Sequence, residues 1–248
     1  MTATTFHPDL YSGKVALVVG GTSGIGAAIA DAFAQLGAVV TVTGATRDEC
    51  DAALAAQNFR CRDAIAVDVR EEAAVAALVA ALPRLDVLVN CAGIIRRVEE
   101  HDVAVFAEVL AINLTGTMRC CTLARDKLKA ARGAIVNTAS VLSFFGGGLV
   151  PGYSASKGGV AQLTKSLAIA YAADGIRVNA IAPGWVATPL TQALQSDPQR
   201  NAAIIARTPL ARWAAPADIA GAAVFLCSPA ARFITGTIMP VDGGYMVR

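Results

Sequence analysis

Short apolar runs rich in β-branched residues alternate along the chain with longer, alanine-rich stretches. The first run, Val-Ala-Leu-Val-Val at residues 15–19, has no polar side chain, as is typical of a strand buried on both faces of a parallel sheet. This alternation favours right-handed βαβ crossovers, so we expect an α/β fold: a doubly wound, Rossmann-type parallel sheet of about seven strands with helices on both faces. The strands are predicted at residues 15–19, 39–43, 63–67, 85–90, 134–138, 177–181 and 237–241.

The glycine-rich segment after the first run predicts a nucleotide-binding turn. Gly20 and Gly24 let the backbone turn tightly and approach a pyrophosphate, and Gly26 lets the next helix pack closely on the strand. The N-terminus of that helix offers unpaired N–H groups and a positive dipole end to phosphates. A strand before the turn and a helix after it favour nucleotide binding over a simple connection. The expected site residues here are Gly20, Thr22, Ser23, Gly24, Ile25 and Gly26.

Tyr153 and Lys157 are four residues apart, so a helix would place both side chains on one face. A tyrosine with a pKa of about 10 is a poor acid or base at neutral pH, and lowering that pKa by about 3 requires roughly 4 kcal/mol. One cation about 4 Å away supplies roughly that energy at an effective dielectric of 20. We therefore expect Lys157 to lower the pKa of Tyr153 and make it a proton-transfer group in a cleft.

Composition narrows the class of protein. The 248 residues are 55% hydrophobic and 16% charged, which is compatible with one domain spanning residues 1–248 that buries more surface than a monomer needs. A net charge of +2, without a Lys/Arg run, gives no indication of nucleic-acid binding. No uninterrupted apolar run of about 18 residues exists, so we expect no membrane span.

The six cysteines are expected to be free, buried thiols. The first ten residues are mostly polar and predict a loose lead-in rather than a signal peptide, which makes the cytoplasm the expected compartment. Disulfides are rare there. The cysteines do not show zinc-site spacing, so no metal is expected.

The ordered motifs resemble the short-chain dehydrogenase/reductase family over nearly the whole chain. That family's Gly-x3-Gly-x-Gly pattern matches Gly20, Gly24 and Gly26, and one departure is Val19, where the family usually has threonine. The other matches are Asn90-Cys91-Ala92-Gly93, Asn113, Ser140, the Tyr-x3-Lys pair Tyr153 and Lys157, Pro183-Gly184, and Val-Asp-Gly-Gly at residues 241–244.

The resemblance implies an NAD(P)-dependent oxidoreductase that moves a hydride between nicotinamide and a secondary alcohol or ketone. Tyr153 would be the acid/base, and Ser140 would hold the substrate oxygen. Lys157 would also bind the nicotinamide ribose, and Asn113 would hold a water that links Lys157 to solvent. Asp68 and Val69 would grip the adenine, although Asp68 could equally cap the helix that follows. The remaining expected cofactor contacts are Asn90, Ala92, Gly93, Pro183, Gly184, Val186 and Thr188.

The end of the second strand bears on the choice of cofactor. An acidic residue there would bind the ribose 2′-hydroxyl and reject a 2′-phosphate. The sequence instead has Gly-Ala-Thr-Arg at residues 44–47, so Thr46 and Arg47 favour NADP. Ser23 argues the other way, because NADP-preferring relatives often carry a cation at that position. We favour NADP, with NAD as the alternative.

The variable segments resemble the subgroup that oxidises sugar acids and polyols, including 2-keto-3-deoxygluconate and gluconate 5-dehydrogenases. Arg96 or Arg97 could pair with a substrate carboxylate, or could equally be solvated or lie between subunits. The substrate candidates are Ser140, Tyr153, Arg96, Phe145 and Trp185, although the two aromatic residues could also just fill core.

Two other functions stay open at this point: a 3-oxoacyl-carrier-protein reductase, and a non-catalytic nucleotide-binding regulator. The intact Ser/Tyr/Lys set argues against the regulator. The helix beginning at Tyr153 is apolar or small around most of its circumference, which indicates burial on more than one side. Together with the family resemblance this predicts a homotetramer.

Overall fold

The computed structural model describes residues 6–56 and 59–248, so residues 1–5 of the predicted lead-in lie outside it. Seven parallel strands form one sheet in the order β3-β2-β1-β4-β5-β6-β7. This confirms the predicted fold class and places every predicted strand within about two residues of its position. The strands are β1 (Val15–Val19), β2 (Val39–Gly44), β3 (Asp63–Ala66), β4 (Val87–Asn90), β5 (Ala134–Thr138), β6 (Arg177–Pro183) and β7 (Ile238–Val241).

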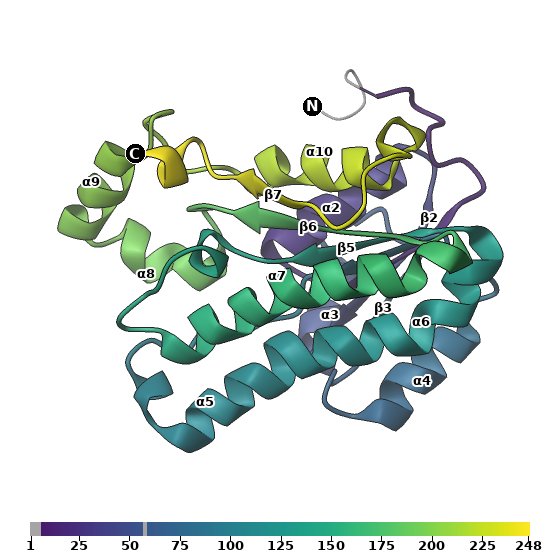
Figure 1. The fold of residues 1–248 in the computed structure, drawn as a ribbon, viewed down its shortest axis with the longest axis horizontal. Coiled ribbons are helices and arrows are strands. Elements are labelled where there is room, and N and C mark those ends of the chain that lie inside the picture. Colours follow the sequence, from purple (N-terminus) through teal and green to yellow (C-terminus); the bar gives the residue numbers. More distant parts are fainter. Residues whose placement is uncertain (1–5, 57–58) are drawn as a thin grey trace.

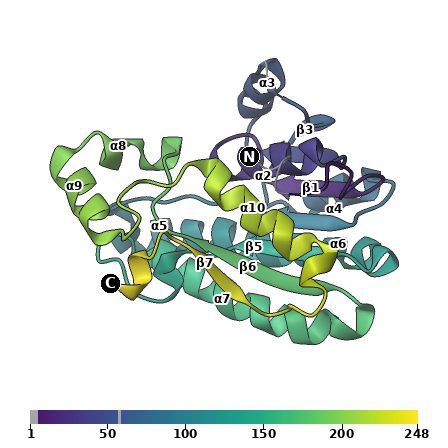
Figure 2. The same ribbon diagram turned by 90° about the horizontal axis from the view of Figure 1, so that it is seen from above.

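Helices cover both faces of the sheet (Figures 1 and 2). On one face, α2 (Gly24–Gln35) and α10 (Pro216–Cys227) pack against each other and share a core that contains Phe33 and Ile219. On the other face, α4 (Glu72–Ala81), α6 (Thr117–Ala131) and α7 (Pro151–Tyr171) enclose a second core around Leu88 and Leu128. The remaining helices are α3 (Arg47–Ala55), α5 (Val103–Leu110), α8 (Gln192–Gln195) and α9 (Pro198–Arg207).

The order of the strands reverses direction between β1 and β4, because the chain moves outward to β3 and then returns to the other side of β1. In a parallel sheet of this kind, ligands bind beyond the carboxyl ends of the strands at such a point. Figure 1 shows α8 and α9 at that end of the sheet, with the C-terminus beside them. The fold therefore directs β1, β4, β5 and β6 toward one shared site.

One helix bears on the expectation that the chain has no membrane span. The continuous helix Val103–Ala131, formed by α5, a π-helical segment and α6, is long and apolar enough to cross a membrane by length and composition alone. It packs against α4 and α7. Core helices of water-soluble folds meet the same criteria, so this helix is a weak indication of a membrane role.

The glycine turn allows α2 to begin almost in contact with β1. A Cβ at Gly26 would lie 2.0 Å from the carbonyl oxygen of Gly20, far inside van der Waals contact. By contrast, a Cβ at Gly221 in α10 would meet no atom within 4 Å. The close packing of α2 therefore requires glycine at position 26, whereas α10, on the same face of the sheet, has room for a side chain at position 221.

We expect Gly26→Ala to destabilise the protein by about 1–3 kcal/mol, because the methyl group forces the turn and the helix apart. Gly221→Ala is the matched control and should stabilise by roughly 0.5–1 kcal/mol, because it removes backbone freedom without a clash. Urea unfolding of the two variants measures both effects. Equal stability of the two variants would contradict this account of the turn.

Candidate active site

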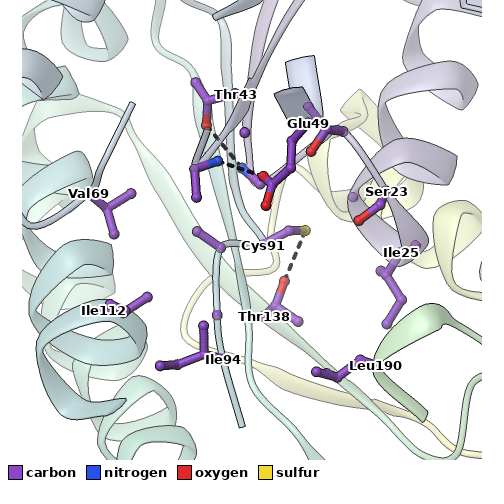
Figure 3. A pocket seen from close by; sticks show the side chains of 18 of the residues that line it. Ser23, Ile25, Thr43, Glu49, Val69, Cys91, Ile94, Ile112, Thr138 and Leu190 are labelled. Atoms are coloured by element: carbon purple, nitrogen blue, oxygen red, sulfur yellow. Dashed lines mark hydrogen bonds between the residues drawn. The ribbon is translucent and has the colours of Figure 1, made fainter. Parts of the chain in front are cut away.

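A cavity of about 520 Å³ lies at the carboxyl edge of the sheet (Figure 3). It runs from the glycine turn and the end of β2 to Tyr153 and Lys157. Of the expected site residues, thirteen line it: Gly20, Thr22, Ser23, Gly24, Ile25, Gly26, Asp68, Val69, Ala92, Gly93, Tyr153, Lys157 and Thr188. Residues far apart in the sequence therefore meet at one place, as the parallel topology requires.

The glycine turn fits a pyrophosphate. Gly20 has φ of +77°, and a Cβ there would lie 2.5 Å from the backbone nitrogen of Ala92, so only glycine is tolerated. The first turn of α2 contains no acidic residue, and the side chain of its N-cap residue Ser23 makes no capping hydrogen bond. The N–H groups and the positive end of the helix dipole therefore face the cavity, which suits an anion.

Lys157 is 4% exposed, and its ammonium donates to the carbonyl oxygen of Thr138 at 2.7 Å. Burial lowers the pKa of Lys157 to about 8, so it is still mostly cationic at neutral pH. An ammonium has three N–H donors, and among the described residues this carbonyl is the one hydrogen-bond acceptor that it reaches. The buried ammonium thus suits a ligand with hydroxyl groups, such as a ribose.

The pKa of Tyr153 corrects one expectation. Desolvation raises it, the hydrogen bond with Ser140 lowers it in part, and the charge of Glu100 raises it further. The net direction is upward, whereas the sequence led us to expect a lowered value. The reason is geometric: Lys157 Nζ lies 5.5 Å from the centroid of the tyrosine ring and donates its hydrogen bond to Thr138.

Asn113 joins the loop after β4 to α7, the helix that carries Tyr153 and Lys157. It is fully buried in the π-helical segment Ala111–Gly116, a type of helix irregularity common at functional sites. Its Oδ1 accepts from the N–H of Ile94 at 2.8 Å, and its Nδ2 donates to the carbonyl of Ile94 at 2.9 Å and to Ser156 Oγ at 3.1 Å. The described contacts thus give Asn113 a positioning role, and the water-holding role stays a prediction.

Glu100 fixes the first turn of α7. Its carboxylate is 2% exposed and accepts from the backbone N–H of Tyr153 and of Arg96, each at 2.8 Å. A carboxylate at a helix N-terminus also interacts favourably with the dipole. The loop that carries Arg96 and the turn that carries Tyr153 are therefore held together by one side chain.

At the adenosine end, Asp68 and Val69 line the cavity as expected. Asp68 accepts from the backbone N–H of Arg70 at 2.9 Å and from its guanidinium at 2.7 Å, and these bonds lower the pKa of Asp68. The alternative role of a helix cap is wrong, because α4 begins at Glu72 with Glu71 as its N-cap.

Thr46 and Arg47 lie at the rim rather than in the wall of the cavity. Both are exposed, and the Thr46 hydroxyl accepts from the N–H of Glu49 at 3.2 Å as the N-cap of α3. Besides Asp68, the acidic side chain of Glu49 lines this end of the cavity, which we did not predict. Its three-residue spacing from Thr46 is a capping-box signal that could have drawn attention to it.

The other expected cofactor residues do not line the cavity, but each stands within five positions in the sequence of a residue that does. Asn90 ends β4, and its Nδ2 donates to Asn137 Oδ1 at 2.9 Å inside the core. Thr188 lines the cavity and is also the N-cap of the 3-10 turn Pro189–Thr191, and its contact with a cofactor stays a prediction. The members of the expected set outside the lining are Thr46, Arg47, Asn90, Pro183, Gly184 and Val186.

The aromatic substrate candidates belong to a second group of side chains. Trp185 packs edge-on against Trp213 and Tyr245, with ring centroids 5.8 and 6.1 Å apart. Phe145 lies 6.2 Å from Tyr245, and the guanidinium of Arg207 lies 4.2 Å from the Tyr245 ring centroid. This group ties the segment after Ser140 to α9 and to the C-terminal turn. No local sequence signal points to Tyr245 or Arg207, because only long-range packing brings them together.

Direct contacts bring together only part of the expected catalytic set, Ser140, Tyr153, Lys157 and Asn113. Ser140 hydrogen-bonds Tyr153, and Asn113 positions the helix that carries Tyr153 and Lys157. Arg96 is exposed, and Arg97 is half-buried, with its pKa lowered by burial and by the charge of Arg200. Within residues 6–56 and 59–248, no group of His, Cys, Asp or Glu is placed to hold a metal ion.

Comparison with known proteins identifies relatives over nearly the full length. A family model described as enoyl-(acyl carrier protein) reductase matches residues 19–246. The chain is 43% identical to 2-dehydro-3-deoxy-D-gluconate 5-dehydrogenase of Bacillus subtilis, over 97% of this chain and 98% of the relative. It is also 43% identical to cis-4-hydroxycyclohexanecarboxylate dehydrogenase of Sinomonas cyclohexanicum, over 96% of this chain and 98% of the relative.

A solved structure from Beutenbergia cavernae is similar in fold and sequence. Its proposed activity is NAD(P)-dependent gluconate 5-dehydrogenase, and it contains NADP at low occupancy. The TM-score is 0.89 and the identity is 40%, over 97% of this chain and all of that chain.

Replacing Tyr153 with Phe removes the hydroxyl and keeps the ring. We expect turnover to fall by about 10²–10⁴-fold or more, which is the usual contribution of a general acid/base, while NADPH still binds. Tyr171→Phe in the same helix is the control, since its ring lies against Arg125 away from the cavity. Steady-state kinetics and fluorescence titration measure the two effects, and near-normal turnover of Tyr153→Phe would disprove the role.

Proposed function

Because this chain belongs to the short-chain dehydrogenase/reductase family and is an NAD(P)-dependent oxidoreductase acting on CH–OH groups, we propose that its substrate is a carboxylic acid with a secondary hydroxyl, such as a sugar acid. The chemistry shared by the relatives supports this class. In 2-dehydro-3-deoxygluconate and in gluconate, three carbons lie between the carboxyl carbon and C5, the carbon that these relatives oxidise. In 4-hydroxycyclohexanecarboxylate, three ring carbons lie between the carboxyl carbon and the carbinol carbon. A sugar chain and a cyclohexane ring otherwise have little in common.

The observation that carries the proposal is that Tyr153 and Lys157 line one cavity, with Ser140 hydrogen-bonded to Tyr153. Bound nicotinamide would accept or supply the hydride. Ser140 would hold the reacting oxygen by a hydrogen bond, and Tyr153 would move its proton. Lys157 would bind the ribose hydroxyls with its buried ammonium.

The loop that carries Arg96 and Arg97 is the proposed binding site for the substrate carboxylate. Glu100 holds this loop at a fixed distance from the turn of Tyr153. Val98, which follows Arg97 in this loop, has φ of +72°, a conformation that a β-branched side chain rarely adopts. Strain of this kind persists where the surrounding structure imposes it and often marks functional loops. Arginine recognises carboxylates through two parallel hydrogen bonds, so either residue suits the role.

The alternative functions have less support. The matching family model carries the description enoyl-(acyl carrier protein) reductase, so acyl thioesters should be tested as substrates beside the hydroxy acids. A non-catalytic regulator would not require Ser140, Tyr153 and Lys157 to be retained together. We place the enzyme in the cytoplasm as one domain of 248 residues.

Exposed apolar side chains support a homotetramer. Ile169 on α7 is 81% exposed, and Met118 on α6 is 39% exposed. Phe233, which precedes the edge strand β7, is fully exposed. An unpaired edge strand beside an exposed aromatic residue is a surface that proteins usually cover. The family resemblance implies two kinds of subunit contact, one through α7 and the long helix that contains Asn113, the other through the C-terminal strand β7. Ile169, Met118 and Phe233 lie on or beside these elements.

The carboxylate requirement can be tested with a matched pair of substrates. We expect cis-4-hydroxycyclohexanecarboxylate to be turned over with kcat/KM about 10- to 100-fold higher than its primary carboxamide, since a hydrogen bond to a charged group contributes about 1.5–3 kcal/mol. Gluconate, 2-dehydro-3-deoxygluconate and a 3-oxoacyl thioester complete the comparison, with NADP and NAD. A preference for the thioester or the carboxamide would contradict the proposal.

Oligomeric state is a separate prediction. Light scattering coupled to size exclusion at micromolar concentration should give about four times the chain mass of 25.4 kDa. Ile169→Glu together with Phe233→Glu should shift the protein toward smaller species, because each adds a charge to a proposed contact surface. A stable and active monomer of the unmodified chain would rule the tetramer out.

A further inference from the structure

The carboxylate that β2 lacks is supplied by the next helix. β2 ends at Gly44, twenty positions after Gly24, where a dinucleotide fold meets the adenosine ribose. Glu49 Oε2 lies 3.0 Å from the position a Cβ of Gly44 would take, so the Glu49 side chain folds back over the glycine. Figure 3 shows this carboxylate turned into the cavity, whose wall it helps to form.

The Glu49 carboxylate is held by the donor that an anion would use. Its Oε2 accepts from the backbone N–H of Ala45 at 2.7 Å, just before α3 begins at Arg47. Thr46 caps the same turn by accepting from the N–H of Glu49. The start of a helix, with its unpaired N–H groups and positive dipole end, attracts negative charge. Glu49 therefore occupies a small anion site at the edge of the cavity.

We propose that Glu49 is an internal substitute for the 2′-phosphate of NADP(H) and thereby sets the balance between NAD(H) and NADP(H). This inference rests on dinucleotide binding in the cavity. The ribose 2′-hydroxyl of NAD(H) can donate to the carboxylate in its present position. A 2′-phosphate needs the Ala45 N–H and the same space, so Glu49 must first move away. Thr46 and Arg47 at the rim can contact the phosphate only after that displacement.

Glu49→Gln tests the proposal, because glutamine can still accept from the Ala45 N–H but carries no charge. NADPH and NADH dissociation constants are measured by fluorescence titration, which does not depend on turnover. We expect NADPH to bind at least tenfold more tightly to the variant, and NADH to bind equally or up to about threefold more weakly. The change for NADPH should shrink at high salt, since the removed interaction is partly exposed to solvent.

Asp48→Asn is the matched control. Asp48 precedes Glu49 in the same first turn of α3 and is exposed, but it does not line the cavity. Its replacement removes an equal charge and should change the NADPH constant by less than threefold. Equal gains in Asp48→Asn and Glu49→Gln, or no gain in Glu49→Gln, would overturn the proposal. Failure of the unmodified protein to bind either cofactor would instead contradict dinucleotide binding itself, and thermal unfolding checks that both variants are folded.

Discussion

The buried ammonium of Lys157 constrains the rest of the site. A charge taken out of water must be compensated by hydrogen bonds or by other charges, and Thr138 at the end of β5 supplies one acceptor. The lowered pKa of Lys157 shows that this compensation is incomplete. A ligand that brings hydroxyl groups to the remaining N–H donors therefore completes the hydrogen bonding of an ammonium that folding has already desolvated. Because Lys157 follows Tyr153 by one turn of α7, the position of that helix places both side chains.

Two buried side chains hold that helix in place. Glu100 accepts from the N–H of Tyr153, and Asn113 connects Ser156 to the loop after β4. Because both side chains are almost inaccessible to solvent, their hydrogen bonds are costly to break and fix the geometry well. The cavity then has two ends with separate tasks. The proposed reacting groups lie at the end beside Lys157, and the proposed adenosine site with its cofactor selection lies at the end beside Gly44.

The sequence predicted the parts of the structure that follow from local pattern. Apolar runs such as residues 15–19 located every strand, and the Tyr153–Lys157 spacing located the face of α7 that lines the cavity. Parallel topology then placed their ends at one edge. What the sequence could not show depends on the direction of individual side chains. The fold-back of Glu49 over Gly44, the rim position of Thr46 and the packing of Tyr245 on Arg207 are of this kind. The pKa of Tyr153 was predicted in the wrong direction, because helical spacing fixes the face of a side chain and not its depth or its hydrogen-bond partner.

The central claim is that this cavity transfers a hydride directly between nicotinamide and the carbinol carbon of a hydroxy acid. The most direct test is to reduce the keto acid with NADPH carrying deuterium at C4, using each of the two stereoisomers in turn, and to locate the label in the product by NMR. The account predicts deuterium on the carbinol carbon from one stereoisomer only, because a single binding geometry presents one face of the ring. Product formed without deuterium from either stereoisomer would contradict it.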